Sequence, residues 1–234
     1  MNDPTAAPDN TPAAWRQSKW LALAEFALVA LIFFADERHF IPVSKTPFLL
    51  MLGWISLRLR GLRWRDVGLT KNRSWKLTLA LGIAAGLLME TFELFVSQPL
   101  LTRLTGKQPD LSDFQDLPGN FKLAALGFLF IWTLAAFGEE MVWRGYLMNR
   151  VADLGKRTRL AWFVSLIVVN MGFGYAHSYQ GITGIIDEGL MGVLLGLMFL
   201  GTGCNLWVPI VAHGVQDTVD LLLIYFSMYP GLHR

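Results

Sequence analysis

The sequence predicts an all-α fold, a polytopic bundle of about seven or eight transmembrane helices. The chain has 234 residues, of which 53% are hydrophobic, and its mean hydropathy is +0.42. Only 16% of the residues are charged, whereas a soluble domain usually contains about a quarter. The apolar residues also form long blocks instead of the alternating stripes of a globular protein, which indicates a membrane protein.

The N-terminal segment differs in composition from the rest of the chain. Residues 1–15 are rich in Pro, Ala, Asp and Asn and are predicted to form a disordered tail. They lack the basic start, apolar stretch and small-residue cleavage site of a signal peptide. Arg16 and Lys19 stand directly before the first apolar block, as in an uncleaved signal anchor. Residues 16–234 are therefore expected to form one transmembrane helical domain.

Seven apolar segments approach the length of roughly 17 to 25 residues that a membrane helix needs. In chain order they are residues 20–35, 46–59, 77–96, 121–148, 160–175, 183–200 and 206–226. The first, second and fifth segments are short for a complete crossing. An eighth helix is expected if the long fourth segment consists of two helices, or if a segment is split at a glycine.

Basic residues are concentrated in alternate loops, which predicts the orientation of the chain. The loop between the second and third segments contains Arg58, Arg60, Arg63, Arg65, Lys71, Arg73 and Lys76. The loop between the fourth and fifth segments contains Arg150, Lys156, Arg157 and Arg159. Because such loops stay in the cytoplasm, we expect a multi-pass membrane protein with a cytoplasmic N-terminus. No patch interleaves many basic residues with aromatic ones, so the expected partner is the lipid bilayer and not a nucleic acid.

The fourth segment contains three charged residues, each of which costs about 2.5–3.5 kcal/mol in hydrocarbon on insertion scales. Glu140 and Arg144 are four residues apart and share a helical face, in the favourable acid-before-base order. Glu139 is rotated by about 100° from that face. Its neighbours one turn earlier, Ala135 and Ala136, are small and leave room for water or substrate. The spacing predicts an ion pair between Glu140 and Arg144 and a free carboxylate at Glu139.

Two later segments also carry polar residues at helical spacing. His177 follows Phe173 by four residues, so an aromatic ring shares its face. His213 and Asp217 are four apart on the last segment, where the carboxylate can fix the tautomer of the imidazole, and they are predicted to form a separate pair. Zinc-protease, serine-elbow and phosphate-loop motifs are absent from the sequence, so the chemistry is expected to depend on carboxylates and histidines.

These residues resemble three motifs of the CPBP intramembrane proteases, a family that includes the type II CAAX prenyl endopeptidases and many bacterial Abi-type proteins. The motifs are, in order, Glu139-Glu140-x-x-x-Arg144, Phe173-x-x-x-His177 and His213-x-x-x-Asp217. Each motif is loose by itself, but the ordered set on apolar helices is specific. The resemblance covers roughly residues 120–226, and it implies an intramembrane endopeptidase of a bacterial-type plasma membrane that acts on a peptide or a lipidated protein.

The resemblance also implies a role for each matched position. Glu139 would activate the attacking water with the help of His177, while Glu140 and Arg144 would orient the site. His213 and the side chain at position 217 would stabilise the oxyanion. Prenyl endopeptidases usually have asparagine at this last position, and an ionised aspartate cannot donate a hydrogen bond as asparagine can. Asp217 is therefore expected to be protonated, to orient His213, or to be part of a metal site.

Several alternatives stay open at this point. Glu139, His177 and His213 are of the types that bind zinc, so a divalent metal cofactor is as compatible with the sequence as metal-free glutamate catalysis, which requires none. The same residues could form a packing network in a non-enzymatic membrane immunity or scaffolding protein. They could also form the proton relay of an ion-coupled transporter, although the broken helices of many transporters are not evident.

Overall fold

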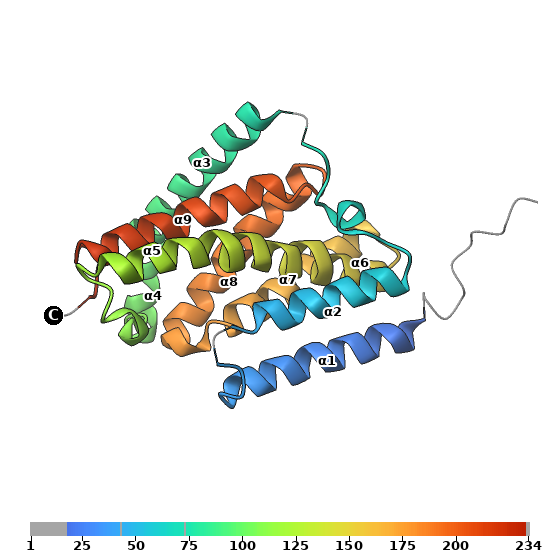
Figure 1. The fold of residues 1–234 in the computed structure, drawn as a ribbon, viewed down its shortest axis with the longest axis horizontal. Helices are drawn as coiled ribbons and strands as arrows, with labels where there is room; N and C mark the ends of the chain where they lie inside the picture. The colour runs from blue at the N-terminus through green and yellow to red at the C-terminus, as the bar shows by residue number, and fades with distance from the viewer. Residues whose placement is uncertain (1–17, 43, 73, 233–234) are drawn as a thin grey trace, which may run out of the picture.

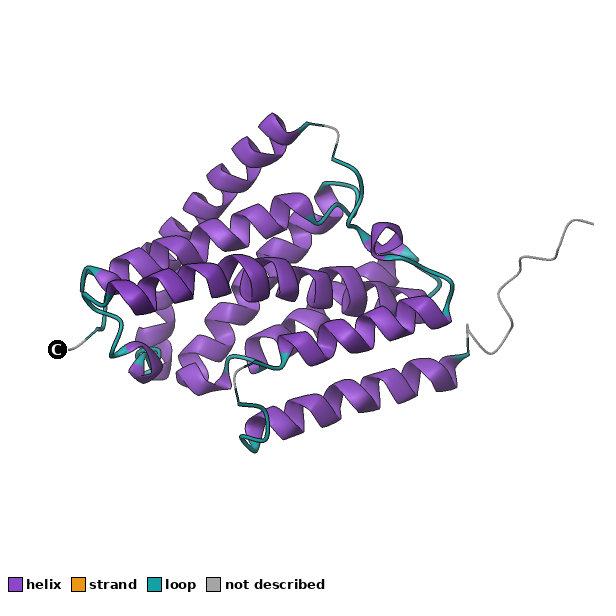
Figure 2. Ribbon diagram, viewed as in Figure 1, coloured by secondary structure: helices purple, strands orange, loops and turns teal. Residues whose placement is uncertain are grey.

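All regular structure in the described part of the chain is helical (Figure 2). The structure is a computed structural model that describes residues 18–42, 44–72 and 74–232. The predicted all-α class is therefore confirmed. The predicted tail, residues 1–15, lies outside the described residues, as does Arg16.

The helices follow one another with short connections (Figure 1). They are α1 (Lys19–Glu37), α2 (Thr46–Leu59), α3 (Trp75–Phe92), α4 (Gln98–Thr105), α5 (Phe121–Phe130), α6 (Asn149–Leu154), α7 (Arg159–Tyr175), α8 (Gly181–Gly201) and α9 (Trp207–Tyr225). Three π-helical stretches are η3 (Glu93–Ser97), η5 (Ile131–Glu139) and η6 (Met141–Met148). Three 3₁₀ turns are η2 (Trp64–Val67), η4 (Ser112–Phe114) and η7 (Ser178–Gln180).

Two of the predicted segments form helices that extend beyond the apolar residues from which they were predicted. The third, expected to end at residue 96, continues through η3 and α4 as one helical run, Trp75–Thr105. The run passes Pro99, which lacks a backbone N–H, and the π-helical turn directly before it is a known way to accommodate such a break. The fourth, expected to end at residue 148, runs unbroken as Phe121–Leu154, so it is one helix and not two.

Polar side chains fix where several helices begin. The Ser74 side chain accepts a hydrogen bond from the backbone N–H of Leu77 at the start of α3. Asn120 caps α5 in the same way, and Thr158 caps α7. Each cap satisfies a backbone donor that has no partner within the helix, so the loop residues themselves define these boundaries.

Four helical runs are long and apolar enough to cross a membrane. They are Trp75–Thr105, Phe121–Leu154, Ser178–Gly201 and Trp207–Tyr225. Two apolar helices, Thr46–Leu59 and Arg159–Tyr175, are shorter. The nineteen residues of α1 include four charged ones, so its crossing stays a prediction. Large apolar side chains are widely exposed on the outside of the bundle, for example Phe95 at 76% and Met171 at 68%, as lipid contact requires. The chain is a membrane protein.

The innermost part of the bundle is η6, in which every residue is buried. It packs against α2 and α7, while α3 lies along α9 on another side (Figure 1). Glycines permit these close approaches. A side chain on Gly86 would begin 2.9 Å from Cβ of Val215 on α9. A side chain on Gly192 would begin 2.9 Å from the Asn170 side-chain oxygen. The charged residues of the fourth segment therefore lie at the centre of the protein, away from lipid.

Candidate active site

The ion pair predicted from helical spacing is present at the centre of the bundle. Nη1 of Arg144 lies 2.5 Å from Oε1 of Glu140, and both side chains are fully buried. The other guanidinium nitrogen, Nη2, donates to Asn170 Oδ1 on α7 at 3.1 Å and to the Gly192 carbonyl on α8 at 2.8 Å. The guanidinium carbon also lies 4.7 Å from the ring centroid of Phe173. Arg144 thereby ties three helical segments together around the Glu140 carboxylate.

His213 joins this network, which corrects the prediction that His213 and Asp217 form a separate pair. Its Nδ1 lies 2.9 Å from Oε1 of Glu140, and its Nε2 lies 3.5 Å from Oδ2 of Asp217. The imidazole therefore lies between two carboxylates on different elements, η5/η6 and α9. Spacing along one helix reveals only the Asp217 partner, because the approach of Glu140 depends on how the helices pack.

His177 lies just beyond the C-terminal end of α7. Its Nδ1 is 2.9 Å from the backbone oxygen of Phe173. A carbonyl oxygen can only accept, so Nδ1 carries the proton of this hydrogen bond and Nε2 is available to other groups. The buried Phe173 ring has its centroid 4.8 Å from that of His177 and 6.1 Å from that of His213. Phe173 therefore supports both imidazoles from one side.

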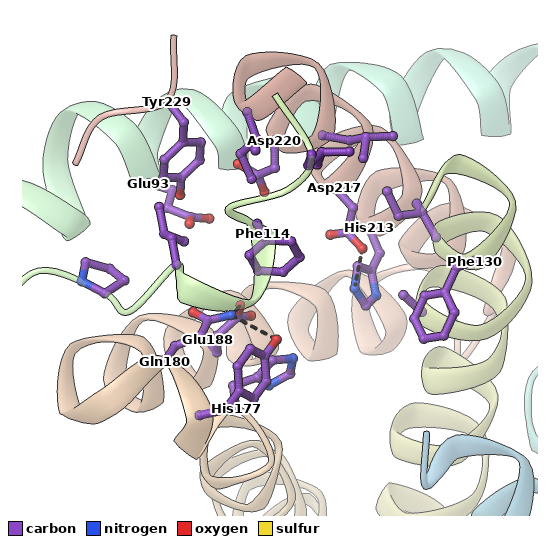
Figure 3. Close-up of a pocket in the computed structure, with 18 of the residues that line it drawn as sticks. Glu93, Phe114, Phe130, His177, Gln180, Glu188, His213, Asp217, Asp220 and Tyr229 are labelled. Carbon is purple, nitrogen blue, oxygen red and sulfur yellow. Dashed lines mark hydrogen bonds and ion pairs between the residues drawn. The ribbon is translucent and has the colours of Figure 1, made fainter. Parts of the chain in front are cut away.

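Glu139 has a different environment from Glu140. Within the described part of the chain it forms no hydrogen bond or ion pair with another side chain. It lines a cavity of about 220 Å³ together with His177, His213 and Asp217. Figure 3 shows His177 on one wall of this cavity and His213 with Asp217 on another. The four side chains come from the fourth run, the connection between α7 and α8, and α9, and they converge on one space.

The cavity lies at the end of the bundle where α7 ends and α8 begins. The loop between α4 and α5 covers it, and Phe114 of η4 projects toward its interior (Figure 3). A second cavity of about 650 Å³ shares Glu139 and His177 and extends to the connection between α1 and α2. Lys45 in that connection lies 2.7 Å from Asp36 and donates to the Ala176 carbonyl at 3.3 Å. The Glu139 carboxylate can therefore be approached from two sides of this end.

The structure identifies residues that sequence reasoning missed. Asn170 and the Gly192 carbonyl hold Arg144 in place, and Tyr179, Gln180 and Glu188 line the cavity. Asn170 could have been identified from the sequence, because it is the one amide side chain within the apolar residues of α7. The Gly192 carbonyl had none, since any residue has a carbonyl and only its position in space matters.

Glu139, His177 and His213 are the residues of this cavity that were expected to bind a metal ion if one is present. Within residues 18–42, 44–72 and 74–232, no three His, Cys, Asp or Glu side chains are grouped so that they could hold one. Glu139, His177 and His213 surround the cavity without closing on a common point. We therefore derive no catalytic step through a metal.

The fold and the site define a class of protein: a helical membrane protein with a buried carboxylate–histidine site that faces a cavity. Residues 121–219 match the family model described as "Type II CAAX prenyl endopeptidase Rce1-like". This range contains all three motifs, so the predicted resemblance is confirmed over this part of the chain.

One relative among known proteins aligns with part of the chain. The protein named "Uncharacterized protein YpbD" of Bacillus subtilis (strain 168) is 34% identical over 99 residues. The aligned part covers 42% of this chain and 46% of that protein, so it spans about half of the relative's length. No solved structure matches the chain.

Proposed function

We propose that this protein is an intramembrane endopeptidase that hydrolyses a peptide bond of a membrane-associated protein. The observation that carries the proposal is the convergence of Glu139, His177, His213 and Asp217 on one cavity inside an apolar bundle. Ionisable groups at such positions are costly and mark functional sites. The family of residues 121–219 supports the same activity.

In the proposed mechanism Glu139 is the general base. Its carboxylate takes a proton from a water molecule, and the water oxygen attacks the carbonyl carbon of the scissile peptide bond. Nε2 of His177 assists in holding the water. As the tetrahedral intermediate collapses, the C–N bond breaks and Glu139 transfers the proton to the leaving amine. The products are one new carboxylate and one new amine, so the reaction is balanced.

The second part of the proposed mechanism is stabilisation of the oxyanion by His213. Glu140, held by Arg144, accepts a hydrogen bond from Nδ1 of His213, which turns Nε2 toward the cavity. When the ring is doubly protonated, Nε2–H donates to the oxyanion. Asp217 lies 3.5 Å from this nitrogen, so its carboxylate is placed to stabilise the doubly protonated ring by charge, while Glu140 orients the ring and Nε2–H stays available to the oxyanion.

Isotope labelling tests the activity directly. Purified protein is incubated in H₂¹⁸O with membrane peptides, both lipidated and unlipidated, and the products are analysed by mass spectrometry. Hydrolysis is expected to place one ¹⁸O atom in the new C-terminal carboxylate, because water supplies that oxygen. If folded protein produces no new termini from any peptide, the non-enzymatic alternative is favoured.

We further propose that the N-terminus is cytoplasmic and that the cavity faces the opposite side of a bacterial-type plasma membrane. The starts of α1 and α3 and the end of α6 lie at the end of the bundle with the basic loops. The loop between α4 and α5, which covers the cavity, lies at the other end and carries Asp110, Asp113 and Asp116. Basic loops stay in the cytoplasm.

Cysteine accessibility tests this orientation. In a Cys204→Ser background, Asp113→Cys is expected to react with a membrane-impermeant maleimide on intact cells. Lys71→Cys, in the basic loop, is expected to react only after the cells are permeabilised. The Cys204→Ser protein without an added cysteine gives the background. The reverse labelling pattern would show that the cavity faces the cytoplasm.

A further inference from the structure

A basic pocket lies at the opposite end of α1 from the candidate active site. It has a volume of about 760 Å³ and is formed by the start of α1, the end of α2 and the end of α6. Its charged lining residues are Lys19, Arg60, Arg150, Asp153, Lys156 and Arg157. Arg60 is paired with Glu25 behind the pocket, so five cations stand against two carboxylates, Asp153 and Glu25, and the remaining positive charge attracts an anionic group.

One of these cations has an unsatisfied donor although it is almost completely buried. Arg150 is 6% exposed and forms an ion pair with Asp153 through Nη2. Its Nε has no hydrogen-bond partner. An unpaired buried N–H is costly, and because this nitrogen is enclosed by protein atoms, a ligand in the pocket can reach Arg150 only through its other guanidinium nitrogens. Arg157 is also held in position, because it pairs with Asp153 at 2.9 Å and donates to Asn149 Oδ1 at 2.9 Å.

A separate apolar groove lies further along α1, toward the middle of the bundle. It has a volume of about 240 Å³ and lies between α1, η6 and α7. Its lining includes Phe26, Ala30, Leu147, Val151 and Val168 and is almost entirely apolar. The two spaces follow the same helix faces: Ala22 of the pocket and Phe26 of the groove are four apart on α1, and Val151 of the groove and Leu154 of the pocket are three apart on α6.

We propose that the pocket and the groove together bind one anionic phospholipid of the bilayer. The phosphate of the headgroup accepts hydrogen bonds from the guanidinium groups of Arg150 and Arg157, and one acyl chain lies in the groove against α1. Charge complementarity selects the headgroup, and the apolar groove on the same faces of α1 and α6 selects a ligand with a hydrocarbon chain. α1 packs chiefly against α2 (Figure 1), and the groove that holds the acyl chain is the one between α1, η6 and α7.

Native mass spectrometry of the full chain tests this proposal with two lipids that differ only in the headgroup, phosphatidylglycerol and phosphatidylcholine with the same acyl chains. The wild-type protein is expected to retain phosphatidylglycerol preferentially. The double variant Lys19→Gln/Lys156→Gln removes two exposed cations of the pocket without breaking any described ion pair. Its preference for phosphatidylglycerol over phosphatidylcholine is expected to fall by about fivefold for each positive charge removed. Lys107→Gln/Lys122→Gln, at the other end of the bundle, is the matched control and should retain it.

A second pair of variants tests the groove. Ala30→Trp places a large ring in the groove and is expected to lower retention of both lipids, whereas Ala24→Trp changes an exposed alanine of the same helix outside the groove and should not. Equal retention of the two lipids by the wild-type protein would overturn the proposal, as would unchanged retention by Ala30→Trp. Inorganic phosphate is added as a competitor to both proteins. If it binds the wild-type protein and Ala30→Trp equally well and displaces no lipid from either, the pocket is a site for free anions and the lipid proposal is wrong.

Discussion

Replacement of Glu139 by glutamine is expected to lower the rate of peptide-bond hydrolysis by about 10²–10⁴-fold, the usual contribution of a general base. Glutamine has nearly the same shape as glutamate but cannot take a proton from water at neutral pH. Because Glu139 has no side-chain partner in the described part of the chain, its replacement breaks no ion pair and the fold should persist. The rate is measured as ¹⁸O incorporation into the product, and the fold as the midpoint of thermal unfolding in detergent.

A matched control makes the same chemical change where no catalysis is proposed. Asp116→Asn converts a carboxylate into an amide in the exposed loop between α4 and α5. It should leave both the rate and the unfolding midpoint unchanged. Undiminished hydrolysis by folded Glu139→Gln protein would exclude Glu139 as the base and would remove the main support for the proposed mechanism.

Replacement of Arg144 by alanine is expected to lower the free energy of unfolding by about 3–5 kcal/mol. The change leaves the Glu140 carboxylate buried without its cation, and it removes the donors to Asn170 and to the Gly192 carbonyl. It also leaves a cavity against Phe173. The loss is measured by unfolding of the purified protein in detergent, followed by far-UV circular dichroism.

Two further variants separate the buried charge from other effects of this change. Arg65→Ala removes a cation from a surface ion pair with 67% and 39% exposed side chains, and it should cost at most about 1 kcal/mol. The double variant Glu140→Gln/Arg144→Met removes both charges and keeps most of the volume. It should recover part of the stability, since replacing a whole buried ion pair costs less than breaking it. A similar midpoint for Arg144→Ala and Arg65→Ala would contradict a structural role for the central pair.

Local sequence patterns were sufficient for much of the helical architecture. Seven apolar segments correspond to seven helical runs, and the capping side chains of Ser74, Asn120 and Thr158 define the starts of three of them. The run that continues past Pro99 was not predicted. A hydropathy pattern ends with the apolar residues, whereas a helix continues as long as its backbone hydrogen bonds can be satisfied.

Helical rise alone does not predict that Glu139 and His177 lie at the same depth in the bundle. Counted along straight helices at about 1.5 Å per residue, Glu139 lies about 16 Å from Arg150 and His177 about 25 Å from the start of its segment. In the structure they line one cavity. The fourth run continues past Arg150 to Leu154, which places Glu139 fifteen residues from its end, and His177 lies beyond the end of α7.

The sequence by itself determined which ionisable side chains would be energetically unfavourable in a membrane and which of them share a helical face. It therefore predicted the Glu140–Arg144 pair, the free Glu139 and the proximity of His213 and Asp217, because these relations depend only on helical periodicity. Tertiary structure decided that His213 bridges Glu140 and Asp217, and that Asn170 and the Gly192 carbonyl hold Arg144. Those contacts join different helices, and their geometry is set by side-chain packing between helices that lie far apart in the chain.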